Sequence, residues 1–98
     1  MENVDGFAIE TTVLFLLVSS RGATSRRKIL TALLSGPKNC NQISKETKLN
    51  WWAIQRHLQH LHHEKLVKIH NFGQIKIYAN TPKGTVALKV CITTKNAT

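Results

Sequence analysis

Apolar side chains in the first third of the chain recur at the three- and four-residue spacing of α-helices. They predict one helix over residues 5–19, with Asp5 as a plausible N-cap and Gly22 as a terminator. A second helix is predicted over residues 26–35, and Gly36-Pro37 predicts a sharp stop behind it. The second half of the first helix is apolar nearly all round, so this helix must be buried on most sides.

Two further helices follow, each behind a good N-cap. Asn39 or Asn41 opens a short helix over residues 42–47, and Asn50 opens a longer one over residues 51–64. At 100° per residue, three apolar residues of the longer helix fall within a sector of about 60° and must face the core: Ile54, Leu58 and Leu61. This sector decides which face of the helix is left for solvent or for a partner.

After Leu66 the apolar period changes from 3.6 to 2, which predicts a β-hairpin over residues 67–78 with its turn at Asn71-Phe72-Gly73. A three-residue loop keeps the apolar and polar sides apart. It pairs Val67 with Ile77, Ile69 with Ile75, Lys68 with Lys76, and His70 with Gln74. Two directly opposed lysines are unfavourable without a counter-charge. A phosphate backbone along the hairpin would supply one; the alternative is two mobile side chains that extend into water.

The chain ends in a fifth predicted helix. Thr81 caps it, Pro82 takes its first position, and a tail is expected over residues 91–98. The predicted elements define an α+β protein that is mostly α, with about five helices and a two-stranded hairpin. A length of 98 residues fits one domain with a thin stability margin, which small domains often recover by dimerising.

Charge is divided unevenly along the chain. Residues 1–20 contain three acids and no Lys or Arg, whereas residues 21–98 contain all 14 Lys and Arg and only two acids. A body this basic attracts a polyanion, and nucleic acid is the usual one. The alternative is a solvated cationic surface that keeps the protein soluble.

Several segments together resemble a known family. RRKIL at 26–30, ISKET at 43–47 and LNWWAIQRHL at 49–58 are similar to the arsenic-repressor-like group of prokaryotic winged helix-turn-helix regulators, as are LVK at 66–68 and IYANTPKG at 77–84. The resemblance covers about residues 24–90. It implies a transcriptional regulator that binds double-stranded DNA, with 51–64 as recognition helix and 67–78 as wing. The single domain would then comprise an N-terminal helix (1–22), a winged-helix body (24–90) and the tail.

The outward face of helix 51–64 supports DNA binding independently. It is rich in hydrogen-bonding groups and has no acid, and the N-terminal part of a recognition helix meets the base edges. A solvated helix would also be polar outside, but it rarely carries an indole such as Trp52 without a partner. Trp51 lies nearer the core and is expected to be structural. The expected DNA contacts are Trp52, Gln55, Arg56 and Gln59 on this helix, Lys45 on the preceding one, and Lys68, His70, Gln74 and Lys76 on the wing.

The apolar segment 13–18 also predicts a homodimer, because a chain this small cannot cover it alone. The contact is expected from the N-terminal helix together with the C-terminal one. The N-terminal residues expected in it are Phe7, Val13, Leu14, Leu17 and Val18. Two recognition helices would then enter successive major grooves about 34 Å apart on an approximately palindromic site.

Other chemistry has little support. Four histidines crowd helix 51–64, but they lack nearby carboxylate or thiolate support, so we expect no metal and no other cofactor. The two cysteines have no metal-ligand spacing and suit a reducing cytoplasm. The apolar run is too short to span a bilayer, the acidic start is unlike a signal peptide, and enzyme motifs are absent. We therefore expect a cytoplasmic protein without enzymatic activity or membrane contact.

Two other functions fit the same fold. A winged-helix module can bind protein, and Trp52 and Phe72 favour that alternative, although such a module would more often expose an apolar groove than a polar, acid-free face. A sequence-tolerant chromatin protein would differ in having a small ratio of specific to non-specific DNA affinity.

Overall fold

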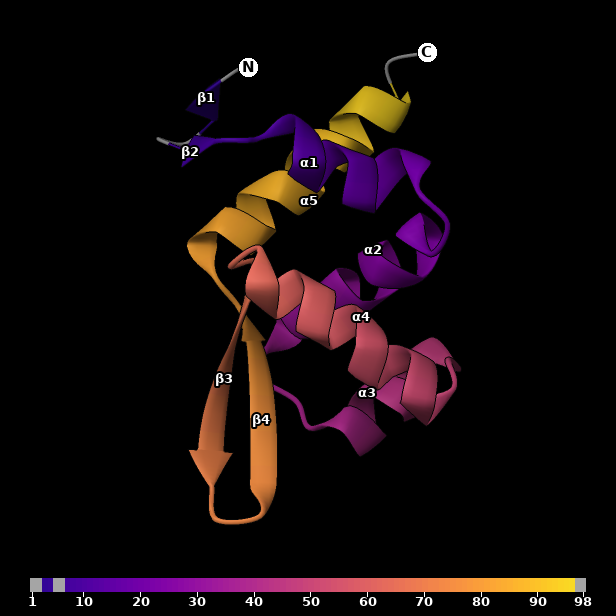
Figure 1. The fold of residues 1–98 in the computed structure, drawn as a ribbon, viewed down its shortest axis with the longest axis vertical. Helices are drawn as coiled ribbons and strands as arrows, with labels where there is room; N and C mark the ends of the chain where they lie inside the picture. The colour runs from indigo at the N-terminus through magenta and orange to yellow at the C-terminus, as the bar shows by residue number, and fades with distance from the viewer. Residues whose placement is uncertain (1–2, 5–6, 97–98) are drawn as a thin grey trace.

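The computed structural model describes the backbone of residues 3–4 and 7–96 and the side chains of residues 9–93. Its elements, in chain order, are β1 (Asn3–Val4), β2 (Phe7–Ala8), α1 (Thr11–Leu14), η1 (Phe15–Ser19), α2 (Ala23–Ala32), η2 (Leu33–Ser35), α3 (Cys40–Thr47), α4 (Trp51–His63), β3 (Val67–Phe72), β4 (Ile75–Asn80) and α5 (Pro82–Asn96). The N-terminal helix and α5 lie together at one end of the molecule, and the β3–β4 hairpin extends from the other (Figure 1). The described residues confirm a mostly helical α+β fold with a winged helix-turn-helix arrangement.

The N-terminal segment differs from the single helix that the sequence predicts. β1 and β2 pair antiparallel, and the helix begins only at Thr11. The predicted N-cap, Asp5, lies outside the described residues. The last turn, η1, is π-helical, and its end is closed by the Ser20 N–H, which donates to the Phe15 carbonyl at 2.9 Å.

Two arginines of α2 hold this segment against the body. Arg26 Nη1 donates to the Leu16 carbonyl and to Ser20 Oγ, both at 2.8 Å, and Arg27 Nη1 donates to the Leu17 carbonyl. The last carbonyls of a helix have no partner within the helix, so the two guanidinium groups satisfy them with charge-assisted bonds. Arg26 is only 6% exposed, and burial lowers the pKa of its guanidinium.

Apolar residues from every α-helix meet in one core. The sector predicted for helix 51–64 is confirmed, because Ile54, Leu58 and Leu61 are each at most 1% exposed. Their neighbours in the core include Val13, Leu17, Ile29, Leu30, Leu33, Ile43, Leu66, Val67, Tyr78, Ala87 and Leu88. This burial orients α4, so that its polar face is turned outward.

Side-chain caps define α3 and α4. Asn39 and Gln42 form a capping box in which each side chain accepts from the other residue's backbone N–H at 2.8 Å. Asn39 is therefore the cap that opens α3, which begins at Cys40, two residues earlier than predicted. The Asn50 side chain accepts from the N–H groups of Trp52 and Ala53 and starts α4 as predicted.

The wing is an antiparallel hairpin, but the predicted register is wrong. The observed register pairs Val67 with Asn80, Lys68 with Ala79, Ile69 with Tyr78, His70 with Ile77, Asn71 with Lys76, and Phe72 with Ile75. The loop is Gly73-Gln74, and Gly73 has a φ of +64°, which glycine adopts without steric cost in a two-residue turn. Lys68 and Lys76 therefore do not oppose each other but lie on opposite faces.

Tyr78 gives the physical reason for this register. It is only 4% exposed, and its backbone exchanges two hydrogen bonds with Lys38, at 2.9 and 2.8 Å. Placing this large aromatic side chain on the core face puts Ile75 and Ile77 on the other face, and Ile75 is 56% exposed. The predicted register took the isoleucines as core residues and left the tyrosine outside.

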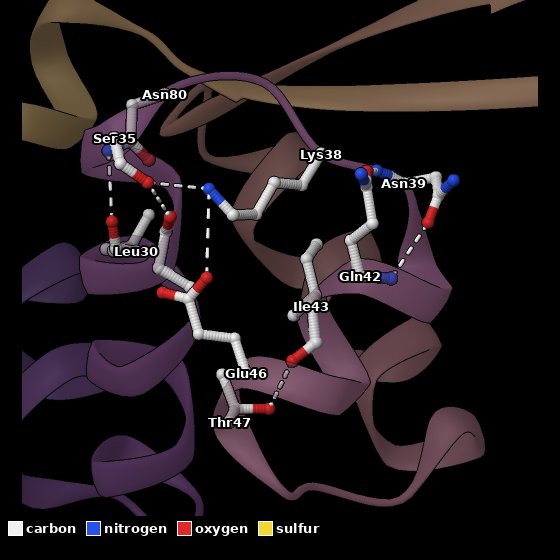
Figure 2. A network of polar contacts seen from close by, with 10 residues as sticks. Leu30, Ser35, Lys38, Asn39, Gln42, Ile43, Glu46, Thr47 and Asn80 are labelled. Atoms are coloured by element: carbon white, nitrogen blue, oxygen red, sulfur yellow. Dashed lines mark hydrogen bonds and ion pairs between the residues drawn. The ribbon is translucent and has the colours of Figure 1, made fainter.

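Lys38 links the wing to the helices (Figure 2). Its Nζ donates to Ser35 Oγ at 2.6 Å and lies 3.8 Å from a Glu46 carboxylate oxygen on α3. At the end of β4, Asn80 Nδ2 donates to the Leu30 carbonyl of α2 at 3.1 Å. These contacts position the wing relative to α3 and α4.

Helix α5 starts as predicted but extends further. Thr81 Oγ1 accepts from the Gly84 N–H at 3.0 Å and donates to the Lys65 carbonyl at 2.6 Å. Gly84 lies against Leu66, because a Cβ at this position would come within 2.0 Å of the Leu66 carbonyl oxygen. The helix continues to Asn96, through most of the segment predicted to be a tail.

Candidate nucleic-acid interface

Helix α4 exposes a stripe directly opposite its buried sector. At 100° per residue, Trp52, Arg56, Gln59 and His63 lie within about 60° of one another. All four are exposed, and Trp52 is 69% exposed. Three of the four DNA contacts predicted on this helix therefore share one solvent-facing stripe.

The fourth predicted contact, Gln55, lies on the flank of α4 that faces the wing. It is half-buried and lines the same cleft as Cys40 at the start of α3. Trp51 is 38% exposed and packs edge-on against Trp52, with ring centroids 4.8 Å apart. Trp51 is not part of the core, although the sequence predicted it close by; it lines the cleft between α4 and the wing.

A cleft of about 260 Å³ separates the N-terminal ends of α3 and α4 from the wing. Its polar lining residues are Asn39, Asn41, Gln55, Gln74 and Lys76. A second cleft of about 280 Å³ follows the wing-facing flank of α4, and Gln55, Gln59, His62 and Lys76 line it. Amide and ammonium donors without a carboxylate among them suit phosphate oxygens.

The structure divides the predicted wing contacts into two groups. Gln74 and Lys76 line the cleft beside α4. Lys68 and His70 lie on the outer face, where they line a separate hollow with Leu34 and Pro37. The outer pair is therefore not brought together with the other predicted contacts. Lys45 is exposed on α3, one helical turn after Asn41 and on the same face.

Sequence reasoning missed Asn39 and Asn41 as lining residues of the cleft. The signal was present, because an N-cap marks the start of a helix, but only the register of the wing brings β4 beside that start. Lys38 was missed for the same reason, since its pairing with Tyr78 is a contact between distant segments.

Electrostatics favour an anion on this side of the molecule. Each acid whose side chain the structure describes lies within 4 Å of a basic residue: Glu10 of Lys83, Glu46 of Lys38, and Glu64 of His63. Within the same described range, Lys45, Arg56 and Lys76 have no such carboxylate neighbour. Their positive charge is therefore available to a polyanion.

The remaining titratable groups do not form a chemical site. Between residues 9 and 93, no three His, Cys, Asp or Glu side chains lie together as a metal site would require. Burial, with the charges of Arg26 and Arg56, lowers the pKa of His57, which lies beside Gly22. Burial also raises the pKa of the Cys40 and Cys91 thiols, so both stay protonated near neutral pH and are poor nucleophiles.

The residues predicted for dimerisation are placed differently. Val13 and Leu17 are fully buried within one protomer, so the prediction that they form a subunit contact is wrong. Leu14 is half-buried against the core and Val18 is 41% exposed. The side chain of Phe7 lies outside the described residues. Sequence reasoning missed Phe15, which is 56% exposed, because an apolar run does not show which residues the core covers.

The fold is that of a winged helix-turn-helix protein. Residues 24–68 match the family model described as bacterial regulatory protein, arsR family. The matched segment holds 45 of the 98 residues and supports a sequence-specific DNA-binding transcriptional regulator. The matched family model and the similar folds are those of transcriptional regulators. No curated protein sequence matches the chain.

Solved structures agree with this fold. BpsR from Bordetella bronchiseptica, whose DNA binding is regulated by 6-hydroxynicotinic acid, has a TM-score of 0.73 at 14% identity, over 88% of this chain and 69% of that one. YodB from B. subtilis has a TM-score of 0.74 at 20% identity, over 92% and 90%. Sso10a-2, a DNA-binding protein from Sulfolobus solfataricus, has a TM-score of 0.68 at 17% identity, over 79% and 81%. In the part of the chain that the structure describes, no helix is long and apolar enough to cross a membrane.

Proposed function

We propose that the protein is a homodimeric regulator that reads an approximately palindromic operator. The stripe of α4 would enter the major groove, and the wing cleft would hold the adjacent phosphate backbone. The observation that carries the proposal is the combination of Trp52, Arg56 and Gln59 on one exposed stripe with Lys76 beside it across the cleft. A prokaryotic regulator that binds chromosomal DNA would act in the cytoplasm.

The dimer contact would form at the end of the molecule opposite the wing (Figure 1). Phe15 and Val18 on η1 and Ile92 on α5 are 56%, 41% and 45% exposed, and these two elements pack against each other. A twofold interface uses the same patch on both subunits, so this apolar patch can pack against the identical patch of a second subunit. We expect Phe15→Glu to give a monomer with weaker operator binding, as measured by sedimentation at micromolar concentration. A wild-type protein that is a stable monomer under those conditions contradicts the dimer.

Selection of bound sequences from random duplex DNA tests the reading mode directly. We expect enrichment of a palindrome whose half-sites are about one helical turn apart. Enrichment of a single half-site would exclude the dimeric mode. Equal affinity for selected and random duplexes would instead indicate a sequence-tolerant chromatin protein.

Arg56 and Lys76 form a matched pair of variants for the interface. Arg56 lies on the stripe, where a guanine edge is within reach, so Arg56→Ala should cost about 1–3 kcal/mol on the operator and much less on a scrambled duplex. Lys76 lies across the cleft from Gln55 and Gln59, where we expect a phosphate. Lys76→Ala should weaken both duplexes alike and reduce the salt slope by about one unit per protomer. Equal losses on both duplexes for Arg56→Ala would remove it from base readout.

A further inference from the structure

The tip of the wing exposes two large apolar side chains that lie outside the hydrophobic core. Phe72 and Ile75 are directly opposed across the hairpin, on either side of the Gly73-Gln74 turn. They are 63% and 56% exposed. Since opposed residues of a strand pair point to the same face, the two side chains form one apolar edge at the end of the wing.

The observed register creates this edge. With Tyr78 on the core face, the opposite face of the hairpin carries His70 and Phe72 on β3 and Ile75 and Ile77 on β4. Further up the wing this face is covered, and Ala79 is only 8% exposed. At the tip, the described neighbour of Phe72 is the ring of His70, whose centroid is 6.4 Å away. Neither Phe72 nor Ile75 contributes to the core.

The charge around this edge indicates what covers it. Residues 65–80 contain Lys65, Lys68 and Lys76 and no acid. A protein partner could cover an apolar edge whether or not the hairpin around it carried acids. A DNA backbone requires a hairpin without acids, because carboxylates would repel its phosphates. Gln74 lies in the turn beside the edge, and the next pair, Asn71 and Lys76, lies on the opposite face of the hairpin; these donors can bond acceptors in the minor groove and phosphates beside it. Charge complementarity therefore favours duplex DNA as the occupant.

Apolar side chains on a basic element act on DNA in a known physical way. Proteins that enter the minor groove often insert Phe, Leu or Ile between base steps, which unstacks the step and kinks the duplex toward the major groove. The cost of unstacking depends on the step and is smallest at flexible pyrimidine–purine steps. A wedge thus adds sequence preference at positions that α4 does not touch.

We propose that Phe72, supported by Ile75, inserts as a wedge between base pairs in the minor groove that flanks the α4 site. The proposal rests on the DNA-binding mode given above, in which α4 occupies the major groove and the wing reaches the neighbouring groove. Phe72 unstacks one step per half-site, and the bend brings the backbone into the cleft beside Lys76. The operator carries a flexible step at this flanking position.

The test uses the full-length protein and operator duplexes with 2-aminopurine placed at successive flanking positions. The fluorescence of this base rises when it is unstacked, so the wild-type protein raises the signal at one step per half-site. Phe72→Ala abolishes the rise, reduces the bend measured by energy transfer between the duplex ends, and weakens binding about tenfold, the equivalent of about 1.4 kcal/mol of stacking. The salt slope stays unchanged, since no charge is removed.

Leu34→Ala is the matched control, because Leu34 is also a large exposed apolar residue, at 53%, but lies on η2 away from the tip. Leu34→Ala leaves the fluorescence rise, the bend and the affinity at their wild-type values. Phe72→Trp, which keeps a large aromatic ring, restores all three quantities that Phe72→Ala loses. Far-UV circular dichroism and urea midpoints confirm that the variants are folded. If the wild-type protein binds without unstacking or bending the duplex, the wedge is wrong but the proposed function stands. The same holds if Phe72→Ala binds DNA like the wild-type protein, which is the result expected if the edge binds a protein partner. Failure of the wild-type protein to bind any duplex overturns the proposed function as well.

Discussion

Replacing Gly84 with alanine tests the packing of α5 on the hairpin, because two effects of opposite sign compete there. In an exposed helix interior, alanine is more favourable than glycine by about 1 kcal/mol. At Gly84, however, the new Cβ would lie 2.0 Å from the Leu66 carbonyl oxygen and 2.9 Å from the carbonyl carbon. Both contacts are with backbone atoms, so no side-chain rotation relieves them.

Relief requires α5 to move away from Leu66 by about 1 Å or more, which restores ordinary contact distances. This movement strains the hydrogen bonds of the Thr81 cap, including the one from the Thr81 N–H to the Leu66 carbonyl at 3.1 Å. Overpacking costs about 1–3 kcal/mol and a lost cap about 1 kcal/mol, so the net destabilisation after the gain in helix propensity is about 1–3 kcal/mol.

The assay is urea unfolding at several protein concentrations, which separates folding from dimerisation. Gly84→Ala should lower the midpoint without changing the slope. Lys89→Ala on the exposed side of α5 serves as the control and should stay within about 0.5 kcal/mol of wild type. A Gly84→Ala variant that is as stable as wild type would show that the close approach of α5 to Leu66 does not exist in solution.

Two further predictions concern Arg26 and His57. Arg26→Met should destabilise the fold by about 1–3 kcal/mol, because the Leu16 carbonyl loses a charge-assisted bond, and an unchanged urea midpoint would contradict the capping role. Because burial and the Arg26 and Arg56 charges lower the pKa of folded His57 below its ordinary 6.5, the unfolded chain binds the proton first as pH falls. Stability should therefore fall as pH drops through about 6.5 and level off below the folded pKa. Unfolding curves of His57→Gln should lack this component, and an unaltered pH profile would refute it.

The sequence predicted the helix-turn-helix well because its signals are local. The buried sector of α4 follows from the spacing of Ile54, Leu58 and Leu61 alone. Asn50 caps α4 through bonds to residues two and three positions away, and Asn39 caps α3 through a bond to the residue three positions away. Because the buried sector fixes the opposite face, Trp52, Arg56 and Gln59 could be placed on the exposed stripe without a structure.

The wing and the N-terminal segment depended on contacts between distant parts of the chain. The register of the hairpin is fixed by Tyr78, which pairs with Lys38 forty residues earlier. The alternation of apolar residues also allowed the register that we predicted, in which Lys68 and Lys76 share one face. In that register Phe72 lies in the turn and does not oppose Ile75, so the apolar edge does not form.

In the same way, the apolar run at residues 13–18 showed that the segment is buried but not which residues the core covers. Arg26 and Arg27 hold the carbonyls of Leu16 and Leu17, and that contact accompanies the burial of Val13 and Leu17 while Phe15 and Val18 stay exposed. Helical periodicity is a property of neighbouring residues, so the sequence alone determined it. The choice of which apolar residues form the core depends on what each of them meets across the fold, and only the tertiary structure decided it.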